Sequence, residues 1–448
     1  MQFSLSTLPI AFLCVTSSLA LTLVENSKTS VCDAAAAIVR GELDYYEGTR
    51  YGGTVGLFTQ PYYWWHAGEV FGGWVDYWYF CQKDNETFTK LLFDAMYHQR
   101  GANNDYIPSN QSLTEGNDDQ GVWGMAIMQA VERNFTTGEF SWILLIQTVF
   151  NTMNNRWDTS TCGGGLRWQI FTWNSGYNYK NSIANGCLFH LSARLYRFTE
   201  QAIYLETCNK VYQWMWDVGF FSFDPDFVIY DGATDTNNCT DLTVHKWSYS
   251  YGIFLAGTAY LYNATSDQKW LTAATTILNA SSFFFNNSIM TETSCQAAQV
   301  CNNDQRSFRS LFSRCLGLTA VLIPSTYNQI FNDYLKPSAL GAAASCSGDG
   351  KDTCGQDWSL GRWDGVWGLG EQMSARECIM TLLTTTEVPL TPKSGGSLAG
   401  ADVDAGNSTI VSNNVHAIDV TKRDKTGAAI LTAVVLSVLI GCAIWIVL

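Results

Sequence analysis

The sequence predicts an all-α fold, an (α/α)6 barrel in which six helical hairpins close into a ring. Helical patterning recurs along the chain with little strand character. Alternate helical segments start near residues 64, 118, 178, 247, 305 and 366, a spacing of about 60 residues on average. Two of these segments begin alike, with Gly121-Val-Trp-Gly124 and Gly365-Val-Trp-Gly368. A regular period of this length indicates repeated helix pairs, and six pairs are enough to close a barrel.

The predicted helices alternate in character. Even-numbered segments open with Gly, Trp, Tyr, Asn or charged residues and then become apolar and rich in small side chains, as expected of buried inner helices. Odd-numbered segments have the pattern of amphipathic surface helices. In chain order, we expect helices over Val31–Tyr46, Trp64–Phe80, Glu86–Arg100, Asp118–Asn134, Phe140–Arg156, Asn178–Phe198, Gln201–Trp216, Trp247–Tyr262, Gln268–Phe284, Gln305–Leu322, Thr326–Leu335 and Val366–Leu383.

Both ends of the chain carry targeting patterns. Residues 1–20 are apolar and end in Ser18-Leu19-Ala20, which predicts a signal peptide. Residues 21–386 then form the predicted catalytic domain. Residues 387–426 are poor in aromatics and rich in Ser, Thr and Gly, which predicts a linker. Residues 427–448 are almost wholly apolar, and a small-residue site, a polar spacer and such a tail predict a glycosylphosphatidylinositol (GPI) attachment signal.

A plain transmembrane helix is the alternative for the tail, since its length is enough to span a bilayer. The tail has no basic flank after it, which favours the lipid anchor. Candidate attachment regions are Gly406–Ser408 and Ser412–Asn414.

Cysteine and sequon usage agree with a secreted glycoprotein. Of 14 Cys, Cys14 lies in the signal peptide and Cys442 in the tail, which leaves an even number for a disulfide framework. Cys295/Cys301 and Cys346/Cys354 are close enough in sequence to pin local loops. Asn-x-Ser/Thr sequons occur at Asn85, Asn110, Asn134, Asn238, Asn263, Asn279, Asn286 and Asn407. We therefore expect a protein at the cell surface.

Composition narrows the function. A net charge of −14 argues against nucleic acid, whose phosphates would be repelled. Aromatic residues make up 14% of the chain, with 17 Trp, and such side chains often line carbohydrate clefts. Large helical cores use them too. Only five His occur, none paired at ligand spacing, so we expect no metal or other cofactor.

The acidic pair Asp118-Asp119 opens the fourth predicted helix and is the main candidate for chemistry. Glycosidic bond cleavage needs two carboxyl groups in different protonation states. Neighbouring aspartates suit the separation of about 5–5.5 Å that retaining glycosidases use better than the wider spacing of inverting enzymes. The alternative is N-capping, with Asn117 as the cap and the acids complementing the helix dipole. The pair alone does not say which aspartate is the nucleophile.

Three stretches together resemble a known family. They are Asn117-Asp118-Asp119-Gln120-Gly-Val-Trp-Gly, Gly164-Gly165-Leu166-Arg167-Trp168 and Tyr177-Asn178-Tyr179-Lys180-Asn181-Ser182-Ile-Ala-Asn185-Gly. In this order they look like the family 76 glycoside hydrolases, and within them the fungal cell-wall branch of mannan endo-1,6-alpha-mannosidases of the Dfg/Dcw type. The similarity covers residues from about 30 to 385. It implies an (α/α)6 barrel, a retaining mechanism, Asp118 as nucleophile and Asp119 as general acid/base.

For the fungal branch the resemblance also implies transfer. The enzyme would cut alpha-1,6-linked mannose in cell-wall mannan or in the core glycan of a GPI anchor, and would join anchored proteins to a beta-glucan acceptor during cell wall biogenesis. Its partners would be these glycans and, through the lipid anchor, the membrane. The alternative is a catalytically idle mannan-binding wall protein.

Further substrate-binding candidates follow from their place at helix starts. Trp64, Trp65 and Trp123 are candidates for stacking on sugar rings, although core aromatics fit them equally well. Lys180, Asn181 and Asn185 open an inner helix and would hydrogen-bond mannose hydroxyls, unless they are ordinary solvated residues of a helix start. Asp364 follows Trp363 before the last inner helix and would orient the substrate.

Overall fold

The computed structural model describes residues 20–135, 140–349, 352–407 and 422–447. The chain divides into two units, Met1–Gly406 and Asn407–Leu448. Apart from Ala20, the predicted signal peptide lies outside the described residues.

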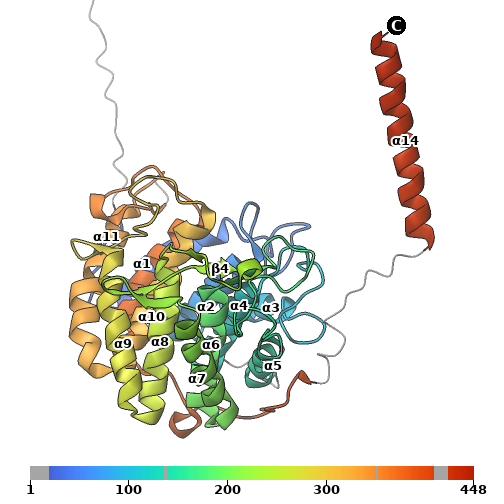
Figure 1. Ribbon diagram of the computed structural model, residues 1–448. Coiled ribbons are helices and arrows are strands. Elements are labelled where there is room, and N and C mark those ends of the chain that lie inside the picture. Colours follow the sequence, from blue (N-terminus) through green and yellow to red (C-terminus); the bar gives the residue numbers. More distant parts are fainter. Residues whose placement is uncertain (1–19, 136–139, 350–351, 408–421, 448) are drawn as a thin grey trace, which may run out of the picture. The chain divides into compact units, whose positions relative to one another are not determined.

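The described part of the first unit contains six inner and six outer helices (Figure 1). The outer helices are α1 (Lys28–Leu43), α3 (Glu86–His98), α5 (Trp142–Asn154), α7 (Ala202–Asp217), α9 (Gln268–Ala280) and α11 (Lys336–Ser345). The inner helices are α2 (Trp64–Tyr77), α4 (Asn117–Glu132), α6 (Ser182–Thr199), α8 (Ser248–Thr265), α10 (Asn303–Leu322) and α12 (Leu369–Thr384). Each inner helix packs on the next in this order, and α12 packs back on α2. The ring is closed, which confirms the predicted barrel.

Short strands lie in the loops between the helices. A three-stranded antiparallel sheet joins β1 (Tyr179–Asn181), β4 (Gly232–Thr234) and β5 (Leu242–Thr243). Two hairpins are formed by β2 (Phe221–Phe223) with β3 (Phe227–Ile229) and by β6 (Phe285–Asn286) with β7 (Ile289–Met290).

Two helix boundaries differ from the prediction. Residues 179–181 pair with β4 as a strand, so α6 begins at Ser182 rather than at Asn178. The eleventh helix is longer than expected: a π-helical stretch, Gln329–Leu335, continues directly into α11, which runs to Ser345. Pro337 lies in the first turn of α11, a position where helices tolerate proline.

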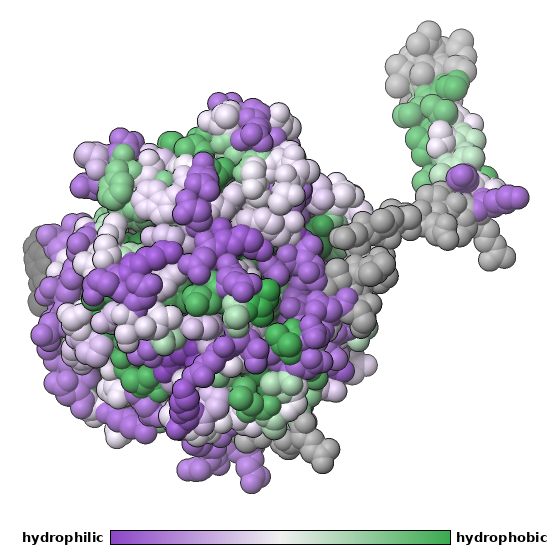
Figure 2. Space-filling view, turned by 60° about the horizontal axis from the view of Figure 1, so that its bottom comes forward, coloured by the Kyte–Doolittle hydropathy of each residue, from purple (hydrophilic) through white to green (hydrophobic). Residues whose placement is uncertain are grey.

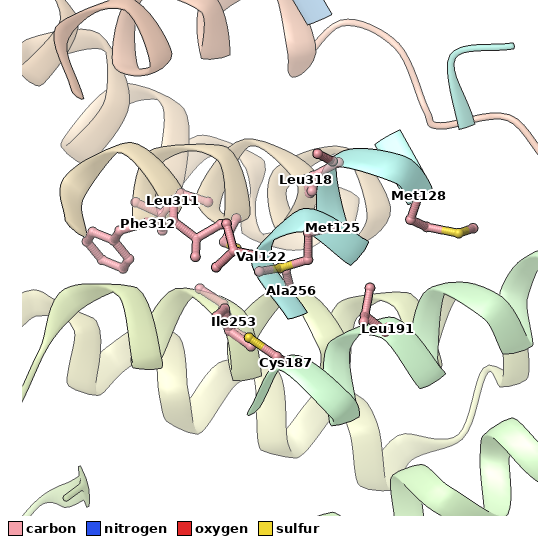
Figure 3. Close-up of a cluster of buried hydrophobic side chains, with 14 of the residues drawn as sticks. Val122, Met125, Met128, Cys187, Leu191, Ile253, Ala256, Leu311, Phe312 and Leu318 are labelled. Atoms are coloured by element: carbon pink, nitrogen blue, oxygen red, sulfur yellow. The ribbon is translucent and has the colours of Figure 1, made fainter. Parts of the chain in front are cut away.

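Small residues let the inner helices approach closely, as the sequence pattern predicts. A Cβ on Gly121 would lie 2.4 Å from Cβ of Cys187, and one on Gly68 would lie 2.9 Å from the Trp123 indole. Figure 3 shows side chains of four inner helices pointing toward one another in this interior, among them Val122, Met125, Cys187, Leu191, Ile253, Leu311 and Phe312. Close packing of this kind fixes the relative positions of the helix starts.

The barrel interior also carries buried charges, which the sequence analysis did not expect. Arg314 of α10 pairs with Glu69 at 3.0 Å and with Glu377 at 2.9 Å. Arg376 pairs with Glu377 at 2.8 Å and with Glu42 at 2.9 Å. These ion pairs link α1, α2, α10 and α12, and removing one partner would leave a buried charge uncompensated.

Four disulfides among the described residues form the framework of the barrel. Cys295–Cys301 and Cys346–Cys354 form as expected, together with Cys32–Cys81 and Cys162–Cys239. The remaining cysteines of the barrel are unpaired and buried in the helix packing, where a thiol acts as a small apolar side chain: Cys187, Cys208, Cys315 and Cys378. The predicted disulfide framework is present, with eight of the twelve barrel cysteines, all of them described, paired.

The chain beyond α12 first returns to the barrel. Residues 387–406, which we call the C-terminal strap, pass over the ends of α4 and α6 that lie at the bottom of Figure 1 and then follow α5. The N–H of Leu390 donates to the carbonyl of Glu132 at 3.0 Å, and the Asn151 amide donates to the carbonyls of Val403 and Ala405 at 2.8 Å each. This segment differs from the free linker that we expected over 387–426.

The outer surface of the barrel is mostly hydrophilic on the face that Figure 2 presents, with scattered hydrophobic groups. In the second unit, α14 (Lys422–Val447) contains the window Lys425–Cys442, which is long and apolar enough to cross a membrane. The attachment candidate Ser412–Asn414 lies outside the described residues.

Candidate active site

A cleft of about 400 Å³ opens where the N-terminal ends of five inner helices, α2, α4, α6, α8 and α10, converge. Its wall contains the aromatic side chains Tyr63, Trp64, Trp65, Trp168, Tyr179, Trp247, Tyr249 and Phe308. It also contains the carboxyl groups Glu115, Asp118, Asp119, Asp231 and Asp304. None of the described residues that line it is Lys, Arg or His.

Asp118 lies in the first turn of α4 with both carboxylate oxygens hydrogen-bonded. Oδ1 accepts the backbone N–H of Asp119 at 3.1 Å, and Oδ2 accepts the indole N–H of Trp168 at 2.9 Å. Two donors and the helix N-terminus favour the ionised form. Burial works against them and raises the pKa of Asp118 to about 7.

Asp119 folds back over the start of the same helix. Its Oδ2 accepts the backbone N–H of Gly116, the N-cap residue, at 2.5 Å. Burial and the neighbouring charge of Asp118 raise the pKa of Asp119 well above its usual range. Because Asp118 receives more hydrogen bonds, the pair retains its last proton on Asp119.

Gly116 gives the two carboxyl groups room to meet. A Cβ at this position would lie 2.2 Å from Oδ1 of Asp118 and 2.9 Å from Oδ2 of Asp119. These two oxygens are therefore at most about 5 Å apart, below the roughly 6.5–9.5 Å of an inverting pair.

The N-terminus of α4 is capped, but Asn117 is not the capping residue that the alternative interpretation of the acidic pair assumed. Asp119 supplies a cap interaction through Gly116, whereas the Asn117 side chain does not cap. The Asn117 amide donates to the carbonyl of Arg167 at 2.8 Å and accepts from Arg156 at 2.8 Å. One helix terminus thus holds both aspartates and gives them different hydrogen-bond partners.

The three stretches that carry the family resemblance meet at this point. The N–H of Asn117 donates to the carbonyl of Trp168 at 2.8 Å, and the N–H of Trp168 donates to the carbonyl of Tyr179 at 2.6 Å. Three separate stretches between residues 117 and 181 therefore form one hydrogen-bonded wall of the cleft.

Three of the predicted substrate-binding residues line the cleft. Trp65 donates its indole N–H to Asp304 at 3.2 Å, and Trp64 donates to Gln99 at 2.9 Å. Asn181 lines the cleft as the N-cap of α6, where its side chain accepts the N–H of Ala184 at 3.2 Å. Their contact with a substrate stays a prediction.

The other four do not line the cleft, and each has a structural partner instead. Trp123 is fully buried against Trp64, with ring centroids 5.3 Å apart. The Lys180 ammonium donates to the carbonyls of Asp158, Thr161 and Gly164 at 2.7–2.9 Å.

Asn185 and Asp364 likewise hold loops in place. The Asn185 side chain bonds both backbone groups of Leu166, at 2.8 and 3.1 Å. Asp364 accepts backbone N–H groups of Gln356, Asp357 and Val366. Trp123, Lys180, Asn185 and Asp364 support the loops and core behind the cleft, and their contact with a substrate stays a prediction.

Several cleft residues were missed from sequence. Asp304 precedes the predicted start of the tenth helix by one residue, and Asp231 lies in a loop that read as an ordinary turn. Tyr179 donates its hydroxyl to Asp231 at 2.6 Å. Burial raises the pKa values of both Asp231 and Asp304. The inner helices around the cleft all start at the same end of the barrel. Comparing the polar residues at these starts would therefore have identified Asp304 as a cleft residue.

Comparisons with known proteins agree with this geometry. The model of glycosyl hydrolase family 76 matches residues 30–393. Mannan endo-1,6-alpha-mannosidase DFG5 of Candida albicans is 56% identical over 98% of both chains. The DFG5 protein of Saccharomyces cerevisiae is 52% identical over 95% of this chain and 94% of its own.

Solved structures share the barrel. Dfg5 from Chaetomium thermophilum in complex with glucosamine is 33% identical, has a TM-score of 0.80, and covers 86% of this chain and 97% of its own. A variant of an alpha-1,6-mannanase of Salegentibacter sp. HEL1_6, in complex with alpha-1,6-mannotetrose, has a TM-score of 0.63 at 15% identity over 79% of this chain and 99% of its own. The second likeness concerns the fold.

Proposed function

Because the chain belongs to glycosyl hydrolase family 76, we propose that this glycoside hydrolase is a retaining endo-1,6-alpha-mannosidase that works mainly by transfer. The observation that carries the proposal is the approach of Asp118 and Asp119 to within about 5 Å at one helix terminus, the separation of a retaining pair. The names of the relatives, mannan endo-1,6-alpha-mannosidases, supply the linkage.

The two aspartates divide the work as follows. The ionised Asp118 attacks the anomeric carbon of a mannose unit while Asp119 gives its proton to the departing glycosidic oxygen. The bond to the leaving sugar breaks, and a mannosyl ester of Asp118 forms. Asp119, now a carboxylate, takes a proton from a hydroxyl of the incoming sugar. That oxygen bonds to the anomeric carbon and releases Asp118.

Charge supports a GPI-core glycan as one donor. Asp118 is ionised in the proposed mechanism and no described cation lines the cleft, so the wall attracts a sugar that carries a protonated amine. Glucosamine is such a sugar, and the Chaetomium Dfg5 structure is a complex with it. Mannan itself is neutral and would depend on stacking by Trp65, Trp168 and the other ring side chains of the cleft.

We further propose a beta-glucan acceptor, secretion and a GPI anchor, so that the enzyme joins anchored proteins to wall glucan. The apolar helix α14, the disulfides and the sequons support the localisation. The strap bears on the attachment site: a Cβ on Gly406 would lie 2.7 Å from Thr148, and Asn151 holds Ala405. Attachment therefore falls beyond Gly406, and Ser412–Asn414 is the better candidate.

Product analysis tests the proposal. The purified protein is incubated with an alpha-1,6-mannosyl glycan that ends in glucosamine, with and without a beta-glucan oligosaccharide. A mixed mannose–glucan product supports transfer, and free mannosides alone would reduce the proposal to hydrolysis. Binding without turnover would overturn it in favour of the idle mannan-binding protein. Mass spectrometry of the mature C-terminal peptide locates the anchor.

A further inference from the structure

Glu115 is a buried carboxyl group of the cleft wall that the two-aspartate mechanism does not use. Its side chain is 1% exposed, and neither carboxylate oxygen has a hydrogen-bond partner among the residues that the structure describes. Its backbone is fully engaged: its N–H donates to the carbonyl of Gln111 at 3.0 Å, and its carbonyl accepts from Ile170 at 3.3 Å. The side chain is thus held at the cleft wall.

The fold supplies no hydrogen bond from the described residues to offset the burial of the Glu115 carboxyl group. An unpaired buried carboxyl costs free energy, whether ionised or neutral. The nearest cation, Arg156, directs its guanidinium to the side chains of Asn117 and Gln120 instead. Burial and the neighbouring Asp119 raise the pKa of Glu115 well above its usual range, with Arg156 opposing and Asp105 adding to the rise. A partner for this neutral acid has to come from the cleft.

The position of Glu115 selects one side of the scissile bond. The N–H of the peptide bond that joins Glu115 to Gly116 donates to Oδ2 of Asp119 at 2.5 Å, and the charge of Asp119 adds to the raised pKa of Glu115. In a retaining mechanism the acid/base contacts the glycosidic oxygen from the leaving-group side, and the nucleophile lies under the anomeric carbon. Glu115 therefore lies beside the sugar that departs, and beside the acceptor that later takes its place.

Two polar neighbours of Glu115 also line the cleft. Gln111 and Thr114 line the cleft from the same turn, in which the N–H groups of Thr114 and Glu115 both donate to the Gln111 carbonyl. Sugar hydroxyls both donate and accept hydrogen bonds, so they can satisfy a carboxylic acid, an amide and a hydroxyl together.

We propose that Gln111, Thr114 and Glu115 form the binding subsite for the leaving sugar and then for the acceptor sugar, with Glu115 as its central hydrogen-bonding contact. This inference rests on the proposed function and adds the residues that choose what receives the mannosyl group. It requires that a substrate with a sugar on this side depends on Glu115 far more than one without.

Two substrates separate these cases. Alpha-1,6-mannotetraose has a sugar as leaving group, whereas alpha-1,6-mannobiosyl fluoride has only fluoride, which occupies no sugar subsite and needs little protonation. For Glu115→Ala we expect kcat/KM to fall about 10- to 100-fold more on the tetrasaccharide than on the fluoride, the range of one or two lost hydrogen bonds. Glu115→Gln keeps a neutral donor and acceptor, and we expect it to recover most of this loss.

A matched control is Asp105→Asn. Asp105 is also fully buried, has an unpartnered carboxylate oxygen and acts on Arg156, but it does not line the cleft. We expect its variant to change kcat/KM on both substrates by the same factor. A second readout is the ratio of transfer to hydrolysis with a glucan oligosaccharide, which should fall in Glu115→Ala.

Equal losses on the two substrates in Glu115→Ala, or an unaltered transfer ratio, would overturn the subsite while leaving the proposed function intact. Failure of the wild-type protein to turn over either substrate would overturn the proposed function itself. Thermal unfolding of each variant shows whether a loss on both substrates comes from misfolding.

Discussion

The indole N–H of Trp168 donates to Oδ2 of Asp118 over 2.9 Å and joins the loop before β1 to the first turn of α4. A hydrogen bond to a carboxylate favours its ionised form, so this contact holds the pKa of Asp118 below the value that burial alone would impose. The contact also places one wall of the cleft against the proposed nucleophile.

Trp168→Phe keeps an aromatic ring but removes the donor. The pKa of Asp118 should rise, so the acidic limb of the kcat/KM profile should move to higher pH, by about one unit for a bond of about 1.4 kcal/mol. The control is Trp173→Phe, because Trp173 donates to the carbonyl of Ser112 and does not line the cleft. Coinciding acidic limbs in Trp168→Phe and wild type would contradict this role.

Removing each aspartate should separate the two chemical roles. Asp118→Asn is expected to lose turnover of both alpha-1,6-mannotetraose and alpha-1,6-mannobiosyl fluoride, since each requires a nucleophile. Asp119→Asn should lose activity on the tetrasaccharide by about 10²–10⁴-fold, the usual worth of general acid catalysis, and retain much more on the fluoride. Both variants should unfold cooperatively. The opposite pattern would exchange the two assignments, and full activity of Asp118→Asn would remove the nucleophile from this site.

The pH dependence of activity follows from the raised pKa values. An ionised Asp118 and a protonated Asp119 are required together, so kcat/KM should be bell-shaped. Its acidic limb should lie near pH 7, well above the usual range of an aspartate, because burial raises the pKa of Asp118 to about 7. The alkaline limb belongs to Asp119 and lies higher. An acidic limb near pH 4 in the initial rates would contradict the burial argument.

The acidic pair should also cost stability at neutral pH. A carboxyl whose pKa is raised on folding contributes fully below its unfolded value near pH 4, and the contribution declines as pH rises toward the folded pKa. Asp119→Asn removes this decline, so its free energy of unfolding should exceed that of wild type at pH 7 and approach it at pH 4. The difference should grow by about 1.4 kcal/mol per pH unit. Urea unfolding at several pH values measures it, and a difference independent of pH would count against a proton held by Asp119.

Gly116→Ala should damage the site more than the fold. The backbone at Gly116, with φ −102° and ψ 169°, is open to alanine, but the added Cβ would lie 2.2 Å from Oδ1 of Asp118. The carboxyl groups would have to separate, and misplacement by about 1 Å costs about 10²-fold in rate. We expect such a fall in kcat/KM together with a smaller drop in melting temperature, because the Cβ would also lie 2.9 Å from the backbone carbonyl oxygen of Trp168. Normal turnover in this variant would show that the pair tolerates a wider spacing.

The barrel itself was predictable from the sequence because the pattern of a buried inner helix recurs along the chain. Inner helices buried on all sides need small residues, and the pattern marks them, as at Gly68 and Gly121. The predicted helix boundaries were wrong where another interaction outweighed the local sequence pattern. Residues 179–181 read as helix but pair with β4, and the eleventh helix was expected to end at Leu335 but continues through α11 to Ser345.

The site was predictable only where its residues lie close together in sequence. Asp118 and Asp119 are adjacent and follow a helix start, so their role was suggested directly. Asp304 reaches the cleft from the start of α10, and only the ring geometry brings it to the pair. Lys180 and Asn185 occupy a recognisable motif, but the motif builds the wall rather than the binding surface: the ammonium of Lys180 is capped by three carbonyls.

The acidic lining of the cleft has a consequence for which glycans are admitted. The ionised Asp118 repels like charge strongly in a partly desolvated cleft, and no described lining cation offsets it. A mannan branch that carries phosphate would therefore meet an electrostatic barrier, whereas an amine-bearing glycan would be drawn in at a rate that falls with added salt. The proposed enzyme would thus select glycans by their charge before any sugar hydroxyl is recognised.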